Sequence, residues 1–184
     1  RAQGSDGLIA YWPGSNGYVH LTAYAVEFLT EVKRANETAK AGYTFDDGLY
    51  RKSIEALKRA LRSDYSRFVS GEVYYERTSA LLALAKAGEL DVGYARELAM
   101  QTTTLDVQAQ AKVYEALQKN SGALKLEIAS LSDKLWGQTV FKTESGREVF
   151  GGLQQRSFRI GERVHTNEIT ALAVMVGAFA VAPN

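Results

Sequence analysis

The sequence predicts an all-α fold that carries one small β-hairpin. Six stretches between residues 21 and 135 place apolar residues three and four positions apart, the spacing that gives a helix one apolar face. A seventh stretch, residues 166–181, is apolar on nearly every side, which is typical of a helix buried all round. Only residues 138–153 depart from the helical pattern, so an α/β architecture is not expected.

The first two helices are indicated by their apolar stripes. The stripe of the first consists of Leu21, Tyr24, Ala25, Phe28, Leu29 and Val32, and Gly42 closes the segment. The second helix is expected to begin at Asp46 and Asp47, because a short carboxylate accepts hydrogen bonds from the free N–H groups of a first helical turn. Its stripe consists of Tyr50, Ile54, Leu57 and Leu61.

Four further helices are expected before the hairpin. The third covers residues 72–87 and ends at Gly88, since glycine readily adopts the left-handed conformation that follows a helix. A short fourth covers residues 91–100, and the threonines at 102–104 interrupt it and can cap a fifth. The fifth presents Val107, Ala111, Tyr114 and Leu117 on one face. The sixth follows a break at Ser121-Gly122 and presents Leu124, Ile128, Leu131 and Leu135.

The remaining elements are the hairpin and the last helix. Residues 138–141 and 147–150 are rich in β-branched and aromatic residues and flank Glu144-Ser145-Gly146, which predicts a small β-hairpin or extended loop. The last helix, over residues 166–181, ends before Pro183. A weak repeat of a threonine followed by small and large apolar residues begins at Thr22, Thr78 and Thr170. Such a repeat fits pairs of inner and outer helices arranged as a barrel.

The composition is that of one soluble globular domain over residues 1–184, with 46% hydrophobic and 23% charged residues. The net charge of +1 gives no field that would attract nucleic acid, and the apolar run at 169–183 is too short to cross a membrane. The absence of cysteine excludes disulfides, thiolate metal sites and cysteine nucleophiles within these residues. We expect no cofactor, since phosphate-loop, nucleophile-elbow and zinc-protease motifs are all missing.

The chain opens with the pattern Q-x-x-D-G-x-x-x-Y-W, formed by Gln3, Asp6, Gly7, Tyr11 and Trp12. Leu21-Thr-Ala-Tyr follows at the start of the first helix. This combination resembles the thioester-containing domain of the α2-macroglobulin and complement family, particularly its bacterial members, in which the helix begins W-L-T-A-Y. His20 stands where the tryptophan usually lies. The resemblance covers nearly the whole chain and is most specific at residues 3–32 and 166–183.

The resemblance implies a partial α/α-toroid of about seven helices. It also implies a parent protein, located in the periplasm or cell envelope, that inhibits or traps proteases as bacterial defence. The family's Cys-x-Glu-Gln thioester motif is absent, and its reactive helix is expected upstream of Arg1, which reads as the start of an excised piece. The chain is therefore expected to be non-catalytic and to contact neighbouring domains of its parent. In isolation it is expected either to self-associate through an open barrel edge or to rearrange its terminal helix so that it covers that edge.

Tyr11 and Trp12 are the candidate site residues, because aromatic side chains in this turn could lie over a thioester and exclude water. The alternative is that they only anchor the turn to the end of the barrel. His20 and His165 are interpreted as packing or helix-end residues, since two isolated histidines do not make a triad or a metal site. The stretch 70–76 lacks the histidine of complement members, which implies a preference for amine nucleophiles.

Two other classes of function stay open, an enzyme on the same toroid and a protein-interaction module. A glycosidase or isoprenoid cyclase would need paired carboxylates, for which Asp46-Asp47 and Glu72/Glu76 are candidates. Asp46-Asp47 lacks the last aspartate of the D-D-x-x-D run of cyclases, and helix capping is the simpler explanation of the two aspartates. A basic cluster is interpreted as a solvated helix face and consists of Lys58, Arg59, Arg62 and Arg67.

Overall fold

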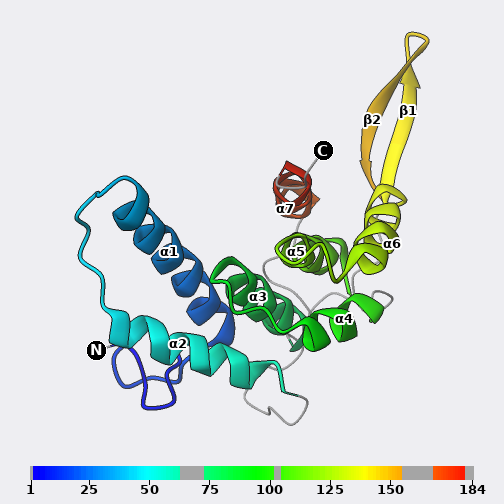
Figure 1. Cartoon of the computed structure of the whole chain (residues 1–184). Coiled ribbons are helices and arrows are strands. Elements are labelled where there is room, and N and C mark those ends of the chain that lie inside the picture. Colours follow the sequence, from blue (N-terminus) through cyan, green and yellow to red (C-terminus); the bar gives the residue numbers. More distant parts are fainter. Residues whose placement is uncertain (1, 63–72, 102–104, 155–167, 181–184) are drawn as a thin grey trace.

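The computed structural model describes residues 2–62, 73–101, 105–154 and 168–180, and within them it contains seven helices and one two-stranded antiparallel sheet (Figure 1). The helices are α1 (Val19–Thr38), α2 (Asp47–Ala60), α3 (Val73–Lys86), α4 (Val92–Met100), α5 (Val107–Gln118), α6 (Lys125–Trp136) and α7 (Glu168–Ala180). The strands are β1 (Thr139–Glu144) and β2 (Arg147–Leu153). The prediction of an all-α fold with one small hairpin is confirmed.

The helices form two layers. In one layer α1 packs on α3, α3 on α5, and α5 on α7, so that the odd-numbered helices make a continuous row. In the other layer α2 covers α1 and α3, while α4 and α6 lie against α5 and against each other. Figure 1 shows the odd-numbered helices following one another along one side, with α2, α4 and α6 along the other. The arrangement of inner and outer helices as a barrel, which the internal repeat predicts, stays a prediction.

Short carboxylates begin three of the helices. Asp46 accepts a hydrogen bond from the Leu49 N–H at 2.9 Å, and Asp91 accepts from the N–H groups of Gly93 and Tyr94. The expected capping of α5 by the threonines is wrong: Asp106 caps it, accepting from the Ala109 N–H at 2.7 Å, and residues 102–104 lie outside the described residues. Aspartate is a better N-cap than threonine here, because its carboxylate is a stronger acceptor than a hydroxyl and interacts favourably with the positive end of the helix dipole.

The ends and faces of the middle helices match expectation. α3 ends at Gly88, whose φ of +79° lets the Glu89 N–H reach back to the Leu84 carbonyl at 2.8 Å. The predicted stripe of α2 is buried, and so are most of the predicted residues of α5 and α6. Val107 and Ile128 are only partly buried. The fully packed positions are Tyr50, Ile54, Leu57, Leu61, Ala111, Tyr114, Leu117, Leu124, Leu131 and Leu135.

The predicted buried face of α1 is wrong. Its buried residues are Val19, Thr22, Ala23 and Val26, a stripe beside the expected one. Tyr24 is 72% exposed and Phe28 62% exposed. The small side chains of Thr22 and Ala23 let α1 approach α2 and α3 closely, whereas the larger side chains of Tyr24 and Phe28 stay mostly exposed.

The prediction that the last helix is buried on every side is also wrong for its described part. Only Ala171, Met175 and Ala178 of α7 are buried, while Ile169 is 79% and Val176 66% exposed. α7 stands at the end of the row and packs mainly on α5, where the Phe179 ring lies 4.9 Å from that of Tyr114. A helix with one neighbour can bury only one face, whatever its hydrophobicity.

The hairpin projects from the helices as a separate arm (Figure 1). Ser145 and Gly146 both have positive φ and form the tight turn between β1 and β2. The register pairs Phe141 with Phe150, whose rings meet edge to face at 6.3 Å. Within the ranges that the structure describes, no helix combines the length and hydrophobicity that a bilayer span would need.

Candidate functional site

The opening motif ties the N-terminal turn to α2. The Gln3 side-chain amide donates to three groups, the Gly7 carbonyl at 3.2 Å, the Leu49 carbonyl at 3.1 Å and the Ser53 hydroxyl at 3.1 Å. The Leu8 N–H donates to the Asp6 carboxylate at 3.1 Å, which closes the turn. The glutamine and the following Asp-Gly pair therefore have structural roles, which explains their place in the motif.

Tyr11 and Trp12 follow this turn but are not part of its anchor. Tyr11 is 55% and Trp12 73% exposed, whereas Leu8 and Ala10 of the same turn are buried. The Tyr11 hydroxyl lies 3.2 Å from Nε2 of His20. The two aromatic side chains are thus displayed at the surface around the start of α1, and their role as a shield stays a prediction.

The structure joins His20 to a buried carboxylate. Nδ1 of His20 lies 3.2 Å from Oε1 of Glu76, a residue that is 1% exposed at the start of α3. With Nδ1–H donating to Glu76, Nε2 is left as the acceptor for the Tyr11 hydroxyl. The resulting carboxylate–imidazole–phenol chain fixes the orientation of the imidazole ring. Neither residue was paired with the other in the sequence analysis.

The internal repeat was the signal that could have revealed this pair. His20 precedes Thr22 by two residues, and Glu76 precedes Thr78 by the same interval. Equivalent positions on neighbouring helices of a repeat face each other, and α1 and α3 are neighbours. Tyr75 extends the cluster, with its ring 6.3 Å from the His20 ring.

A cleft of about 280 Å³ lies beside this cluster, between α1, α3, α5 and α7. One ammonium group, that of Lys86, contacts two carboxylates there: Glu27 Oε2 at 2.7 Å and Glu115 Oε1 at 3.0 Å. Burial alone would lower the pKa of Lys86, but hydrogen bonds to the two carboxylates outweigh it and raise the pKa above the ordinary value. Both carboxylates share this one cation, so they do not flank an open space as a glycosidase pair does.

Lys112 is the second cation of the cleft. Unlike Lys86, it contacts a hydroxyl group and an aromatic ring. Nζ donates to the Ser79 hydroxyl at 2.8 Å and lies 4.0 Å from the centre of the Tyr75 ring. Burial lowers the pKa of Lys112 to about 8. The Glu27 carboxylate opposes this change, and the nearby Lys86 ammonium adds to it. No carboxylate contact to Lys112 within ion-pair distance occurs in the described ranges.

We expect the Lys112→Met variant to be more stable than the parent chain at pH 7, by on the order of 1 kcal/mol. The folded-state pKa of about 8 lies below the unfolded value of 10.5, so between these pH values the unfolded state binds more protons. Stability of the parent chain therefore rises from pH 8 to pH 10.5, and the advantage of methionine disappears over that interval. Urea unfolding at pH 7 and pH 10 measures the difference.

The exposed Lys119, at the C-terminal end of α5, provides the control. Lys119→Met should leave stability nearly unchanged at both pH values. An effect of Lys112→Met that is equal at pH 7 and pH 10 would show that the ammonium is not desolvated in the folded protein.

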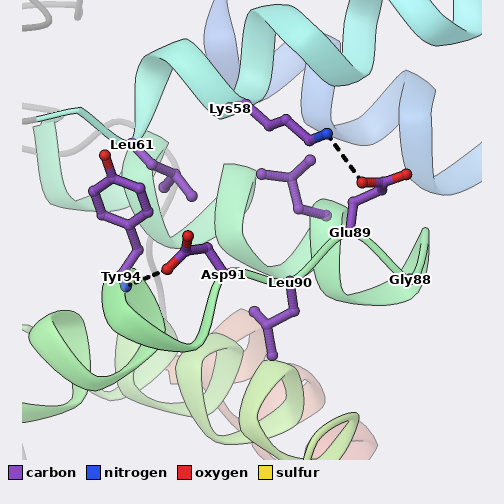
Figure 2. Close-up of a pocket in the computed structure, with 8 residues that line it drawn as sticks. Lys58, Leu61, Gly88, Glu89, Leu90, Asp91 and Tyr94 are labelled. Carbon is purple, nitrogen blue, oxygen red and sulfur yellow. Dashed lines mark hydrogen bonds and ion pairs between the residues drawn. The ribbon is translucent and has the colours of Figure 1, made fainter.

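A second cavity, of about 420 Å³, lies between α2, the end of α3 and the start of α4 (Figure 2). Lys58 reaches across it to Glu89 at 2.9 Å, and it also pairs with Glu55. Hydrogen bonds to these two carboxylates raise the pKa of Lys58. Figure 2 shows the Asp91 carboxylate turned to the Tyr94 N–H, where it caps α4. These polar groups have structural roles. Of the predicted basic cluster, Arg59 and Arg62 are exposed, as expected for a solvated helix face, and Arg67 lies outside the described residues.

The other candidates have structural roles or lie outside the described residues. Asp46 caps α2 and Asp47 pairs with Arg51 at 2.7 Å, so neither forms an acidic site. His165 and residues 70–72, which include Glu72, lie outside the described residues. In the part of the chain that the structure describes, histidine and acidic side chains form no cluster able to hold a metal ion.

The fold is similar to part of two solved structures of Escherichia coli α2-macroglobulin. The native conformation, from cryo-electron microscopy, matches with a TM-score of 0.58 and 20% identity over 72% of this chain. The trypsin-activated form, from a crystal, matches with a TM-score of 0.56 and 21% identity over 72% of this chain. The matched regions are 8% and 9% of those chains. No family model matches the sequence, and neither does any curated protein.

These two matches define a class of fold, a two-layered helical segment as found in bacterial α2-macroglobulins. At about one-fifth identity the likeness concerns the fold.

Proposed function

We propose that this chain is part of the thioester-type domain of a bacterial α2-macroglobulin-like protease inhibitor, located in the periplasm or cell envelope. The likeness of its fold to two structures of the Escherichia coli protein carries the proposal. The opening motif adds support, because its glutamine, aspartate and glycine form the anchored turn that leads into α1. Since trypsin activates the Escherichia coli protein, the expected partner of the parent protein is a protease.

In this proposal the two layers are an arc of an α/α-toroid that other helices of the parent protein complete. The exposed apolar side chains at both ends of the row support it, Tyr24 and Phe28 on α1, Ile169 and Val176 on α7. Apolar side chains gathered on a helix face of a soluble protein usually mark a surface that another element covers. Neighbouring parts of the same protein are the natural partners of these faces.

Tyr11 and Trp12 are assigned to shielding a thioester carried elsewhere in the parent protein. Their exposure supports this, because a shield must be free to contact a group that this chain does not contain. The expected preference for amine nucleophiles rested on a stretch without histidine. His20 lies beside Tyr11 and is oriented by Glu76, so we do not extend that preference to this protein.

Incubation of the full-length parent protein with trypsin tests the function. We expect trypsin to co-elute with the parent protein on size exclusion, to retain activity on a small peptide substrate and to lose activity on a large protein substrate. Replacing Tyr11 and Trp12 together by alanine should reduce covalent capture if a thioester is present. Trypsin that stays free and fully active on large substrates would refute the inhibitor function.

An enzyme on the same fold is the competing class. The purified chain should show no turnover of glycosides or isoprenoid diphosphates, because the two carboxylates of the cleft are both bound to Lys86. Reproducible turnover that Glu27→Gln abolishes would replace the inhibitor proposal with an enzyme.

We expect the isolated chain to self-associate through the exposed ends of the helix row. Replacing Tyr24 and Phe28 together by glutamine should shift the dimer equilibrium towards monomer by about tenfold or more, since two large apolar side chains leave the interface. Light scattering after size exclusion over a range of concentrations measures the equilibrium. Leu126→Gln removes an equally exposed side chain from α6 and is the control. A parent chain that is monomeric at every concentration would contradict the open edge.

A further inference from the structure

The cleft between the odd-numbered helices contains a group that the proposed function does not use. Lys112 projects from α5 towards Ser79 and Tyr75 of α3, and Tyr24 of α1 and Val174 of α7 complete the surroundings. Its amine contacts the Ser79 hydroxyl and the Tyr75 ring and borders a space of about 280 Å³. That volume is close to the lower end of the range for small-molecule sites.

We propose that Lys112 is a reactive amine that binds small, uncharged aldehydes covalently in this cleft. The inference is independent of the proposed protease inhibition, because it concerns the chemistry of one side chain and its cavity. The proposal assigns a modification site to the cleft between the odd-numbered helices, whose other described contacts have structural roles.

Lys86 is excluded as the reactive group by its contacts. Its ammonium lies between Glu27 and Glu115, which hold it in the charged form and raise its pKa. An ammonium has no lone pair and cannot attack a carbonyl. Lys112 instead contacts a neutral hydroxyl and an aromatic ring, and its pKa of about 8 leaves about one-tenth of it uncharged at pH 7.

Ser79 is excluded as a nucleophile by its place in α3. Its hydroxyl donates to the Tyr75 carbonyl at 2.8 Å while it accepts from Lys112, so its proton is already engaged within the helix. It is 6% exposed. Backbone N–H groups in a helix interior are bonded to carbonyls of the preceding turn, so no oxyanion site is available beside it. The Ser–Lys contact therefore positions the lysine and does not form a hydrolase pair.

The walls of the cleft define the class of ligand. The Tyr75 ring, Leu82 and Val174 offer apolar surface for a flat or aliphatic body. When Lys112 is in its uncharged, reactive form, the Glu27 and Glu115 carboxylates outnumber the Lys86 ammonium, and this excess of negative charge disfavours anionic ligands. A small aromatic aldehyde without charge fits both conditions.

The chemistry needs no additional reagent. The uncharged Nζ attacks the carbonyl carbon, a C–N bond forms, and the carbonyl oxygen gains a proton to give a carbinolamine. Loss of that hydroxyl as water leaves an imine, so one amine and one aldehyde give one imine and one water with no change of oxidation state. Hydride from added cyanoborohydride reduces the imine to a stable secondary amine, which allows the site to be mapped.

The experiment uses the 184-residue chain with benzaldehyde and cyanoborohydride at pH 7, followed by peptide mass mapping. We expect Lys112 to be labelled about tenfold faster than Lys86 or the exposed Lys119, because its larger uncharged fraction outweighs the lower nucleophilicity of a weaker base. The α-amino group, with an ordinary pKa near 8, serves as an internal reference for rate. Negatively charged 4-carboxybenzaldehyde should label Lys112 several-fold more slowly than benzaldehyde does.

Variants of two charged neighbours of Lys112 should change its labelling rate in opposite directions. Lys86→Met removes a positive charge that lowers the pKa of Lys112, so labelling at pH 7 should slow by severalfold. Glu115→Gln removes a negative charge that raises it, so labelling should accelerate. Lys112→Arg, with folding checked by circular dichroism, should abolish the adduct on that peptide. Labelling of Lys112 no faster than Lys119, or rates that both charge variants leave unchanged, would overturn the proposal.

Discussion

Replacing Leu117 by alanine should lower the free energy of unfolding by about 3 kcal/mol. Leu117 is fully buried in α5, the helix that packs against α3, α4, α6 and α7 at once. Truncation removes the buried methyl groups and leaves a cavity that surrounding helices cannot fill, because they are held by contacts on several sides. Urea denaturation followed by circular dichroism measures the change.

The control for this substitution is Leu126→Ala. Leu126 is 84% exposed on α6, so its truncation should change stability by less than about 0.5 kcal/mol. Equal effects of the two substitutions would mean that α5 is not the centre of the core. A loss at Leu117 below about 1 kcal/mol would lead to the same conclusion.

The second large effect is expected at Gly7, in the turn of the opening motif. A Cβ added there would lie 2.5 Å from the Lys52 carbonyl oxygen and 3.2 Å from Cβ of Ala56, so the turn would have to move away from α2. Its φ of +83° adds a conformational cost for any L-residue with a side chain. We expect Gly7→Ala to lower the free energy of unfolding by about 3 kcal/mol and the melting temperature by about 6–12 °C.

Gly14 provides a matched comparison because its φ is +82° but nothing lies within 4 Å of an added Cβ. Gly14→Ala should lower the free energy of unfolding only by the conformational cost of a positive φ, about 1 kcal/mol. The difference between the two variants measures the clash with α2 alone. If Gly7→Ala and Gly14→Ala melt at the same temperature, the turn is not seated against α2 as described.

Helical spacing and end signals in the sequence were sufficient for most of the architecture. Residues such as Leu57 and Leu131 lie on stripes that coincide with the buried faces of α2 and α6, because those helices have neighbours on one side only. Asp91 and Gly88 marked the ends of elements through local hydrogen bonds. Such signals depend on residues a few positions apart, which is why the sequence displays them.

The two errors in burial arose at the ends of the helix row. Tyr24 of α1 and Val176 of α7 were expected to be buried because they are large and apolar, and both are exposed. The spacing of apolar residues identifies a helix face that favours burial. Which face is actually covered depends on the helices that pack against it. In α1 the small residues around Ala23 allow closer packing than the aromatic stripe does.

The site could be predicted only in part. Tyr11 and His20 were noticed because they lie in or beside a recognisable motif. The contact between His20 and Glu76 joins residues 56 positions apart, and the cleft around Lys112 needs four helices to form. Properties such as the lowered pKa of Lys112 arise from burial, which a sequence does not display directly.

A cryo-electron microscopy structure of the full-length protein that contains this chain tests the central claim most directly. We expect residues 2–180 to form part of a closed ring of paired helices, with further helices of the same protein covering Tyr24 and Phe28 at one end and Val176 at the other. Tyr11 and Trp12 should lie against the position of the thioester or of its remnant. A structure in which both ends of the helix row stay in solvent, with no ring, would contradict the assignment to a thioester-type domain.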